Sequence, residues 1–83
     1  MGTGDREVAK AEIRNRIRRL RFDHGEMTQQ ELAERVGCTR QTIVLLEQER
    51  YVPSLALALR IAQVFGATIE QVFELAGGAR SDL

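Results

Sequence analysis

The clearest helical pattern of apolar and polar positions lies within residues 28–48 and predicts two short helices joined by a tight turn. Thr28 is followed three residues later by Glu31, which is the capping-box pattern that starts a helix. Gly37 can adopt the positive φ of a helix end, and Thr39 can cap a second helix. The positions that share the apolar face of the pair are Leu32, Ala33, Val36, Ile43 and Leu46. Helices this short are unstable alone, so we expect the flanking segments to supply the surface on which they pack.

The flanking segments repeat apolar residues at helical spacing, so we expect five helices and no strand. The first helix is predicted from residue 5 to about residue 22, with its buried stripe at Ala9, Ile13, Ile17 and Leu20. The fourth follows the cap Ser54 and runs to residue 65. The last begins behind the capping box of Thr68 and Gln71 and runs to about residue 76. This order of elements predicts an all-α domain.

The fourth predicted helix is apolar on two sides. One side carries Leu55, Ala58, Leu59, Ala62 and Phe65, and the other carries Leu57, Ile61 and Val64. A helix with so little polar surface lies either at the centre of the core or partly in a subunit interface. The pattern alone leaves both positions open for the second side.

The length of 83 residues allows one domain. We place this domain at residues 13–76, after an N-terminal extension (1–12) and before a flexible tail (77–83). No apolar run has the length of a membrane span or of a signal peptide. The single cysteine, Cys38, cannot form an internal disulfide, so we expect a cytoplasmic location.

The formal net charge is zero, but the charges are unevenly distributed. Residues 1–25 carry seven basic and four acidic side chains, whereas residues 26–83 carry five basic and eight acidic ones. An anionic partner must therefore be met by a local surface. A run of arginines stands before the helix pair, at Arg14, Arg16, Arg18, Arg19 and Arg21. These arginines form either a solvated face or a set of phosphate contacts near the helix pair.

The chain has no arrangement of side chains typical of an enzyme. His24 is the only histidine and no cysteine pair accompanies it, so the sequence indicates neither a metal site nor a catalytic pair. A domain of this size also leaves little room for a substrate pocket. We expect no catalytic activity, no cofactor, no metal and no small-molecule ligand.

Residues 28–48 and the helices around them resemble the helix-turn-helix of the Cro/C1-type (Xre) family of phage-repressor-like transcriptional regulators. The family pattern has glutamine at the start of the first helix, alanine in its middle, glycine in the turn and aliphatic residues along the second helix. The matching residues are Gln29, Ala33, Gly37, Ile43 and Leu46. The resemblance covers about residues 13–75 and implies a compact five-helix domain. The second helix of the motif, residues 39–48, would enter the major groove of double-stranded DNA.

The resemblance and helical geometry together indicate which residues contact DNA. Arg40 and Gln41 are expected to read base edges, because arginine can pair with guanine and glutamine with adenine through two hydrogen bonds. Val44 and Leu45 are expected to pack on thymine methyl groups. The expected contacts to the DNA backbone are Gln29, Thr39, Gln48, Arg50 and Tyr51.

We call this second helix, residues 39–48, the reading helix. Other residues around it also have family counterparts. Arg21 and Glu47 match a buried ion pair that would fix the angle of the reading helix. Glu49 stands where the family usually has glycine, so either the helix continues or a negative charge lies near the DNA phosphates. The loop at residues 25–27 is about one residue longer than the commonest form, and Cys38 occupies a position that is usually buried.

The leading functional prediction is a sequence-specific DNA-binding transcriptional regulator that acts as a homodimer on a palindromic operator. One motif reads only a few base pairs, which favours two copies on two half-sites. The expected dimer interface consists of Leu57, Ile61, Val64 and Phe73. An antitoxin or a controller of a restriction–modification locus would use the same fold. A protein-interaction module that has lost DNA binding is a third alternative, slightly favoured by the neutral charge, by Glu49 and by the apolar pair Val44 and Leu45.

Overall fold

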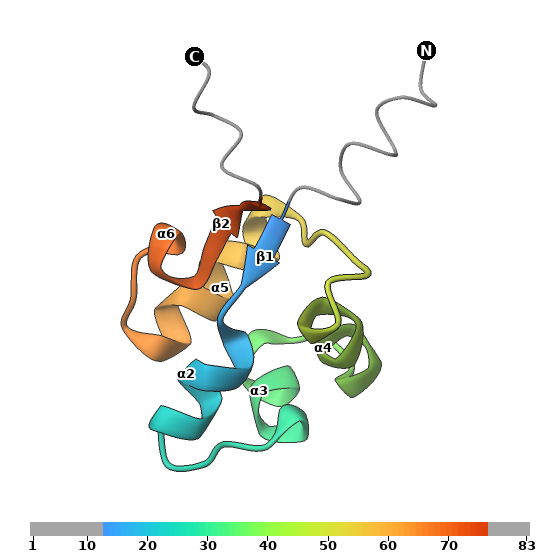
Figure 1. The fold of residues 1–83 in the computed structure, drawn as a ribbon. Coiled ribbons are helices and arrows are strands. Elements are labelled where there is room, and N and C mark those ends of the chain that lie inside the picture. Colours follow the sequence, from blue (N-terminus) through green and yellow to red (C-terminus); the bar gives the residue numbers. More distant parts are fainter. Residues whose placement is uncertain (1–12, 77–83) are drawn as a thin grey trace, which may run out of the picture.

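The computed structural model describes residues 13–76, which form five helices and a two-stranded antiparallel sheet (Figure 1). The helices are α2 (Ile17–Asp23), α3 (Gln29–Val36), α4 (Arg40–Glu47), α5 (Leu55–Phe65) and α6 (Ile69–Val72). The strands are β1 (Ile13–Asn15) and β2 (Phe73–Leu75). The predicted helical fold class is confirmed, whereas the expectation that the domain contains no strand is wrong.

Four of these helices begin at the side chains that were predicted to cap them. Each cap oxygen accepts a hydrogen bond from the backbone N–H three residues later, and the caps are Thr28, Thr39, Ser54 and Thr68. Both predicted capping boxes are complete, with Glu31 and Gln71 returning a bond to the N–H of the cap residue. These bonds satisfy backbone groups that have no partner within the helix, so the helices start where the sequence predicts.

The two outer helices are shorter than predicted. Residues 13–15 form β1, and α2 begins only at Ile17. At the other end, α6 stops at Val72, and Phe73 adopts an extended backbone with φ of −123° and ψ of 149°. The part of the first predicted helix at residues 5–12 lies outside the described residues.

The ends of both predicted helices are extended because they pair with each other. The register places Ile13 opposite Leu75 and Asn15 opposite Phe73. Each strand therefore supplies hydrogen-bond partners to the backbone of the other. The pairing joins the two ends of the domain, and such a tertiary contact overrides a local helical pattern.

All five helices contribute to one apolar core. The largest fully buried side chains are Ile17, Leu32, Val36, Ile43, Leu46, Ile61 and Val72. The core position of α5 is clear from residues on both sides: Leu55 and Leu59 are 69% and 49% exposed, but the buried residues are Leu57, Ala58, Ile61, Ala62 and Phe65. The apolar character of α5 therefore reflects a central helix whose exposed leucines lie on the remaining surface.

This burial corrects the predicted dimer interface. Leu57 and Ile61 were expected to meet a second copy of the chain, but both already pack in the core of their own chain. Val64 and Phe73 are half-buried and pack against the same core. Leu57 and Ile61 are thus excluded as interface residues, because their side chains are already buried against other helices of the same chain.

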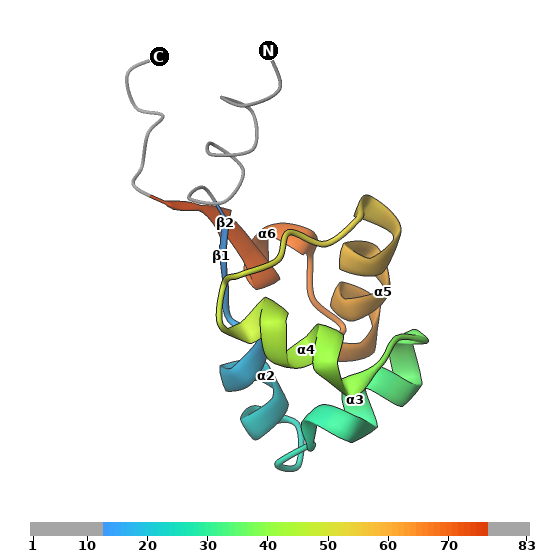
Figure 2. The ribbon, with the colours of Figure 1, turned by 90° about the vertical axis from the view of Figure 1, so that its right-hand side faces the viewer.

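The packing leaves α4 on one face of the molecule. Figure 2 shows α4 in front, with α2 and α3 below it and the sheet above its carboxyl end. The chain leaves α4 along this face before it turns into α5. The predicted reading helix is therefore supported from behind and open in front.

Candidate nucleic-acid interface

The turn between α3 and α4 is held by local hydrogen bonds. Gly37 ends α3 in the left-handed conformation with φ of 81°. The N–H groups of Gly37 and Cys38 both donate to the carbonyl of Ala33. Thr39 then accepts a hydrogen bond from the N–H of Thr42 and starts α4. These bonds fix how α3 and α4 are oriented relative to each other, and the turn that contains them is only a few residues long.

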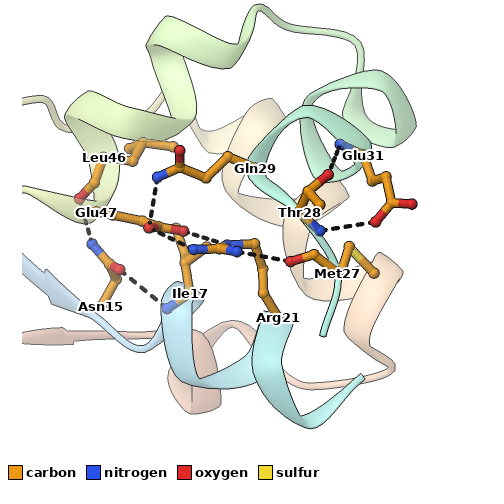
Figure 3. Close-up of polar contacts among 9 residues, drawn as sticks. All are labelled: Asn15, Ile17, Arg21, Met27, Thr28, Gln29, Glu31, Leu46 and Glu47. Atoms are coloured by element: carbon orange, nitrogen blue, oxygen red, sulfur yellow. Dashed lines mark hydrogen bonds and ion pairs between the residues drawn. The ribbon is translucent and has the colours of Figure 1, made fainter. Parts of the chain in front are cut away.

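A charged cluster ties α4 to the rest of the motif (Figure 3). Arg21, on α2, forms two hydrogen bonds with the carboxylate of Glu47, of 2.6 Å from Nε and 3.0 Å from Nη2. Its Nη1 donates at 2.7 Å to the carbonyl of Met27. Gln29, at the start of α3, donates from Nε2 at 3.1 Å to Glu47. The predicted ion pair is therefore present, and it joins α2, α3 and α4.

The burial of this pair makes it more than a surface contact. The side chains of Arg21 and Glu47 are only 14% and 9% exposed. Charges removed from water are tolerated where other hydrogen bonds satisfy their remaining donors and acceptors. Met27 and Gln29 supply such bonds here. The cluster holds the last turn of α4 in one position relative to α2 and α3.

The side of α4 opposite its core residues carries the predicted base contacts. Ile43 and Leu46 are fully buried, whereas Arg40 and Gln41 are exposed near the amino-terminal end. Val44 and Leu45 are half-buried, and Gln48 is exposed at the C-cap. The helix therefore separates one apolar supporting side from one side that is open to a partner.

An open hollow of about 550 Å³ lies between α2, α3 and the carboxyl half of α4. Its lining residues are Arg18, Arg21, Thr28, Gln29, Val44, Glu47 and Gln48. The structure thus brings three predicted contact residues, Gln29, Val44 and Gln48, to one place beside the ion pair. Arg40, Gln41 and Leu45 do not line this hollow.

Two of the predicted backbone contacts also have structural roles. Gln29 donates one amide N–H to Glu47, and within residues 13–76 the rest of its side-chain amide makes no further hydrogen bond. The hydroxyl of Thr39 caps α4 and lies 3.1 Å from the hydroxyl of Thr42. Both residues stand at a helix amino-terminus, where free N–H groups and the helix dipole favour an anion.

Arg18 lines the hollow, and it belongs to the arginine run that was expected to be either a solvated face or a set of phosphate contacts. It is exposed on α2, three residues before Arg21. Residues three apart lie on the same face of a helix. Arg21, the predicted partner of Glu47, already indicated which side of α2 faces the motif. The sequence therefore contained the signal that Arg18 lies on that side.

The segment after α4 presents two of the predicted backbone contacts. Glu49 adopts a left-handed conformation with φ of 61°, and its N–H donates to the carbonyl of Leu46. The N–H of Arg50 donates to the carbonyl of Leu45. Arg50 and Tyr51 are both exposed beyond this turn. The helix therefore ends at the usual place although the family glycine is replaced.

Cys38 and His24 take part in ordinary structural contacts. Cys38 is half-buried in the turn, where burial raises the pKa of its thiol. His24 is exposed at the end of α2, with Nδ1 at 2.9 Å from the carbonyl of Leu20.

Within residues 13–76 no three acidic, histidine or cysteine side chains gather as a metal site. No helix in that part of the chain has the length and apolarity needed to cross a membrane.

Comparison with known proteins agrees with this geometry. The sequence family described as helix-turn-helix matches residues 17–72. An uncharacterised helix-turn-helix-type transcriptional regulator of Archaeoglobus fulgidus is 56% identical over 61 residues, which cover 74% of this chain and 86% of that protein. A similarly described protein of Methanothermobacter thermautotrophicus is 56% identical over 64 residues, covering 76% and 91% of the two chains. One from Bacillus subtilis is 44% identical over 63 residues, covering 76% and 94%.

A solved structure supports the fold. The crystal structure of a candidate DNA-binding protein from Bacteroides fragilis superposes with a TM-score of 0.65 at 24% identity, covering 75% of this chain and 98% of that one. At this identity the similarity concerns the fold alone, and the family assignment comes from the sequence relatives. The chain belongs to the Cro/C1-type (Xre) helix-turn-helix family and is a DNA-binding transcriptional regulator, not an enzyme.

Proposed function

We propose that the chain regulates transcription by binding a specific sequence of double-stranded DNA through α4, as a homodimer on a palindromic operator. The observation that carries this proposal is the two-sided character of α4. Its inner side is fully buried and its last turn is held by the Arg21–Glu47 pair. Its outer side presents Arg40 and Gln41 to solvent. A rigidly held helix with free polar side chains is suited to reading base edges in the major groove.

The phosphate contacts in this proposal surround the reading helix. Gln29 and Thr39 stand at the amino-termini of α3 and α4, where free N–H groups favour an anion such as a phosphate. Arg18 and Gln48 stand at the hollow between the helices. Such contacts fix the register of the protein on DNA, whereas Arg40, Gln41, Val44 and Leu45 supply sequence preference.

Dimerisation is proposed through an apolar groove between the sheet, α6 and the segment that leads into α5. The groove has a volume of about 250 Å³. Its lining residues are Ile13, Val52, Pro53, Leu55, Ala58, Ile69 and Phe73. Leu55 and Val52 are 69% and 41% exposed beside it. Of the interface first predicted, only Phe73 belongs to this groove.

A second copy of the chain is the proposed occupant of the groove. The segment that leaves α4 leads directly into this surface. A two-fold axis passing here would relate the two α4 helices by symmetry, and a palindrome requires them to lie about one helical turn of DNA apart. The apolar side chains around the groove would then be buried by their own counterparts.

Selection of bound duplexes from a random library, repeated at two salt concentrations, tests the proposed function. We expect a palindromic motif whose half-site centres are separated by about 10 base pairs or a multiple of that spacing. Binding should also weaken as salt rises, because phosphate contacts release counterions. A single, non-repeated motif would count against the dimer. No enrichment and no salt dependence would instead favour a protein-interaction module.

A further inference from the structure

Asn15 connects the two-stranded sheet to the reading helix. It is the last residue of β1, and its side chain is partly buried. Its Nδ2 donates a hydrogen bond of 2.7 Å to the backbone carbonyl of Leu46, in the last turn of α4. Its Oδ1 accepts a hydrogen bond of 3.1 Å from the N–H of Ile17. Figure 3 shows the single amide of Asn15 reaching both segments.

The bond to Ile17 is a local one. A side-chain oxygen that accepts from the backbone N–H two residues later forms an Asx-turn, which asparagine and aspartate both make. Here it satisfies one of the free N–H groups at the start of α2. This bond explains a short acceptor side chain at position 15, but it does not require an amide.

The bond to Leu46 requires the amide. The carbonyl of Leu46 already accepts from the N–H of Glu49 at 2.9 Å, and Asn15 supplies the second donor. A carboxylate at position 15 could not donate this bond. The next residue of α4 is Glu47, which Arg21 holds from α2. The end of α4 is therefore anchored at two successive residues, from the sheet and from α2.

We infer that Asn15 is a positioning residue for DNA reading, which sets the angle of the carboxyl end of α4 relative to the sheet. The inference rests on the proposed function of α4. Apolar packing on bases and contacts to the DNA backbone both depend on where the last turn of α4 lies. A shift at Leu46 would move Val44 and Gln48, which lie in the same turn. Asn15 thereby acts on base recognition without touching DNA itself.

Two variants separate this role from helix capping. Asn15→Asp keeps the acceptor for Ile17 and replaces the donor to Leu46. Asn15→Ser also keeps an acceptor, adds no charge, and is too short to reach Leu46. The control is Thr68→Ala, which removes the cap of α6 just before β2 but keeps both hydrogen-bonding groups of Asn15. All three variants are compared in the full chain.

The first readout is the specificity ratio, measured as affinity for the selected duplex over affinity for a random duplex at the same salt. We expect both Asn15 variants to lower this ratio about tenfold, the effect of disturbing one base-pair contact. Binding to the random duplex should fall by much less. Thr68→Ala should keep the wild-type ratio even if it lowers the melting temperature. An unchanged ratio in both Asn15 variants would overturn the inference.

The second readout needs no DNA. Amide exchange of Glu49 and Arg50, whose N–H groups bond to the last turn of α4, should accelerate in both Asn15 variants but not in Thr68→Ala. Exchange rates at these two amides equal to those of the wild type would also overturn the inference. If the wild-type chain selects no DNA sequence, the proposed function fails. The exchange result then still decides whether Asn15 holds α4.

Discussion

Glu49 and Gly37 both end a motif helix in the left-handed conformation, but only Gly37 is suited to it. Their φ angles are 61° and 81°. A side chain with a Cβ atom pays a steric cost in this region, which glycine avoids. Glu49 adds a negative charge immediately after the reading helix. The residue is therefore unfavourable for local backbone geometry and for approach to phosphates.

Replacing Glu49→Gly should stabilise the domain by about 1 kcal/mol, because the backbone strain disappears. The same change at Glu34, which lies within α3, should destabilise the domain by about 1 kcal/mol, since glycine weakens a helix interior. Chemical denaturation of both variants measures these opposite signs. Equal destabilisation by the two substitutions would show that Glu49 is not strained. Glu49→Gly should also strengthen binding to duplex DNA at low salt.

The ion pair of Arg21 and Glu47 predicts a larger effect at the scale of single residues. Glu47→Lys should destabilise the domain by about 3 kcal/mol, because it leaves Arg21 beside a second positive charge in a mostly buried site. Glu74→Lys breaks the half-exposed pair with Arg16 and should cost less than about 1 kcal/mol, since solvent screens that pair. Thermal melts of both variants test the contrast. A melting temperature unchanged by Glu47→Lys would contradict the structural role.

At the scale of the element, α4 combines a supporting side and a reading side within eight residues. The period of the apolar residues was enough to predict both sides. Ile43 and Leu46 are buried as the pattern required, and Arg40, Gln41 and Gln48 are exposed. What periodicity could not predict is the hollow at one end of α4, because α2 and α3 form its other walls.

The two ends of the interface should respond differently to loss of an arginine. Arg40→Ala should reduce affinity for the selected duplex by about 1–3 kcal/mol and relax the base preference at one position. Arg18→Ala should weaken binding to all sequences alike and lower the salt dependence by about one phosphate contact. Titrations of specific and random duplexes at several salt concentrations distinguish the two patterns.

Arg60→Ala is a matched control for both arginine variants. Arg60 is exposed on α5 and does not line the hollow beside α4. Its loss should leave the specificity and the salt dependence as in the wild-type chain. If Arg40→Ala weakened all duplexes equally, Arg40 would be a phosphate contact and not a base contact.

At the scale of the whole molecule, the sheet and the segment after α4 create an apolar surface that no single element predicts. Ile13 and Phe73 come from the two strands, and Val52 and Leu55 from the other side of the groove. The pairing of the strands brings the strand residues Ile13 and Phe73 together. The proposed dimer therefore depends on a sheet that the sequence pattern did not indicate.

Leu55→Glu should shift the chain from dimer to monomer, because a charge would enter the proposed apolar interface. Leu59→Glu is the matched control, since Leu59 is 49% exposed on the same helix but does not line the groove. Sedimentation velocity over a range of concentrations measures the state of each variant. Identical sedimentation of Leu55→Glu and the wild-type chain would exclude this groove as the interface.

The parts predicted best from sequence are those governed by neighbouring residues. The caps Thr28, Thr39, Ser54 and Thr68 lie at the helix starts, because a cap bonds to a backbone group three residues away. The ion pair between Arg21 and Glu47 was expected from the family resemblance alone, and it is present. The placement of Leu57 and Ile61 in an interface was wrong, because spacing shows that a helix is apolar but not what covers it.

The sequence by itself determined the helix-turn-helix, its caps, its turn and the two sides of α4, since each depends on local backbone chemistry and helical period. The tertiary structure alone decided that residues 13–15 and 73–75 are strands, and that α5 is buried on its second side. It also decided that Asn15 reaches Leu46. These outcomes join residues far apart in the chain, and only the packed fold brings their backbones together.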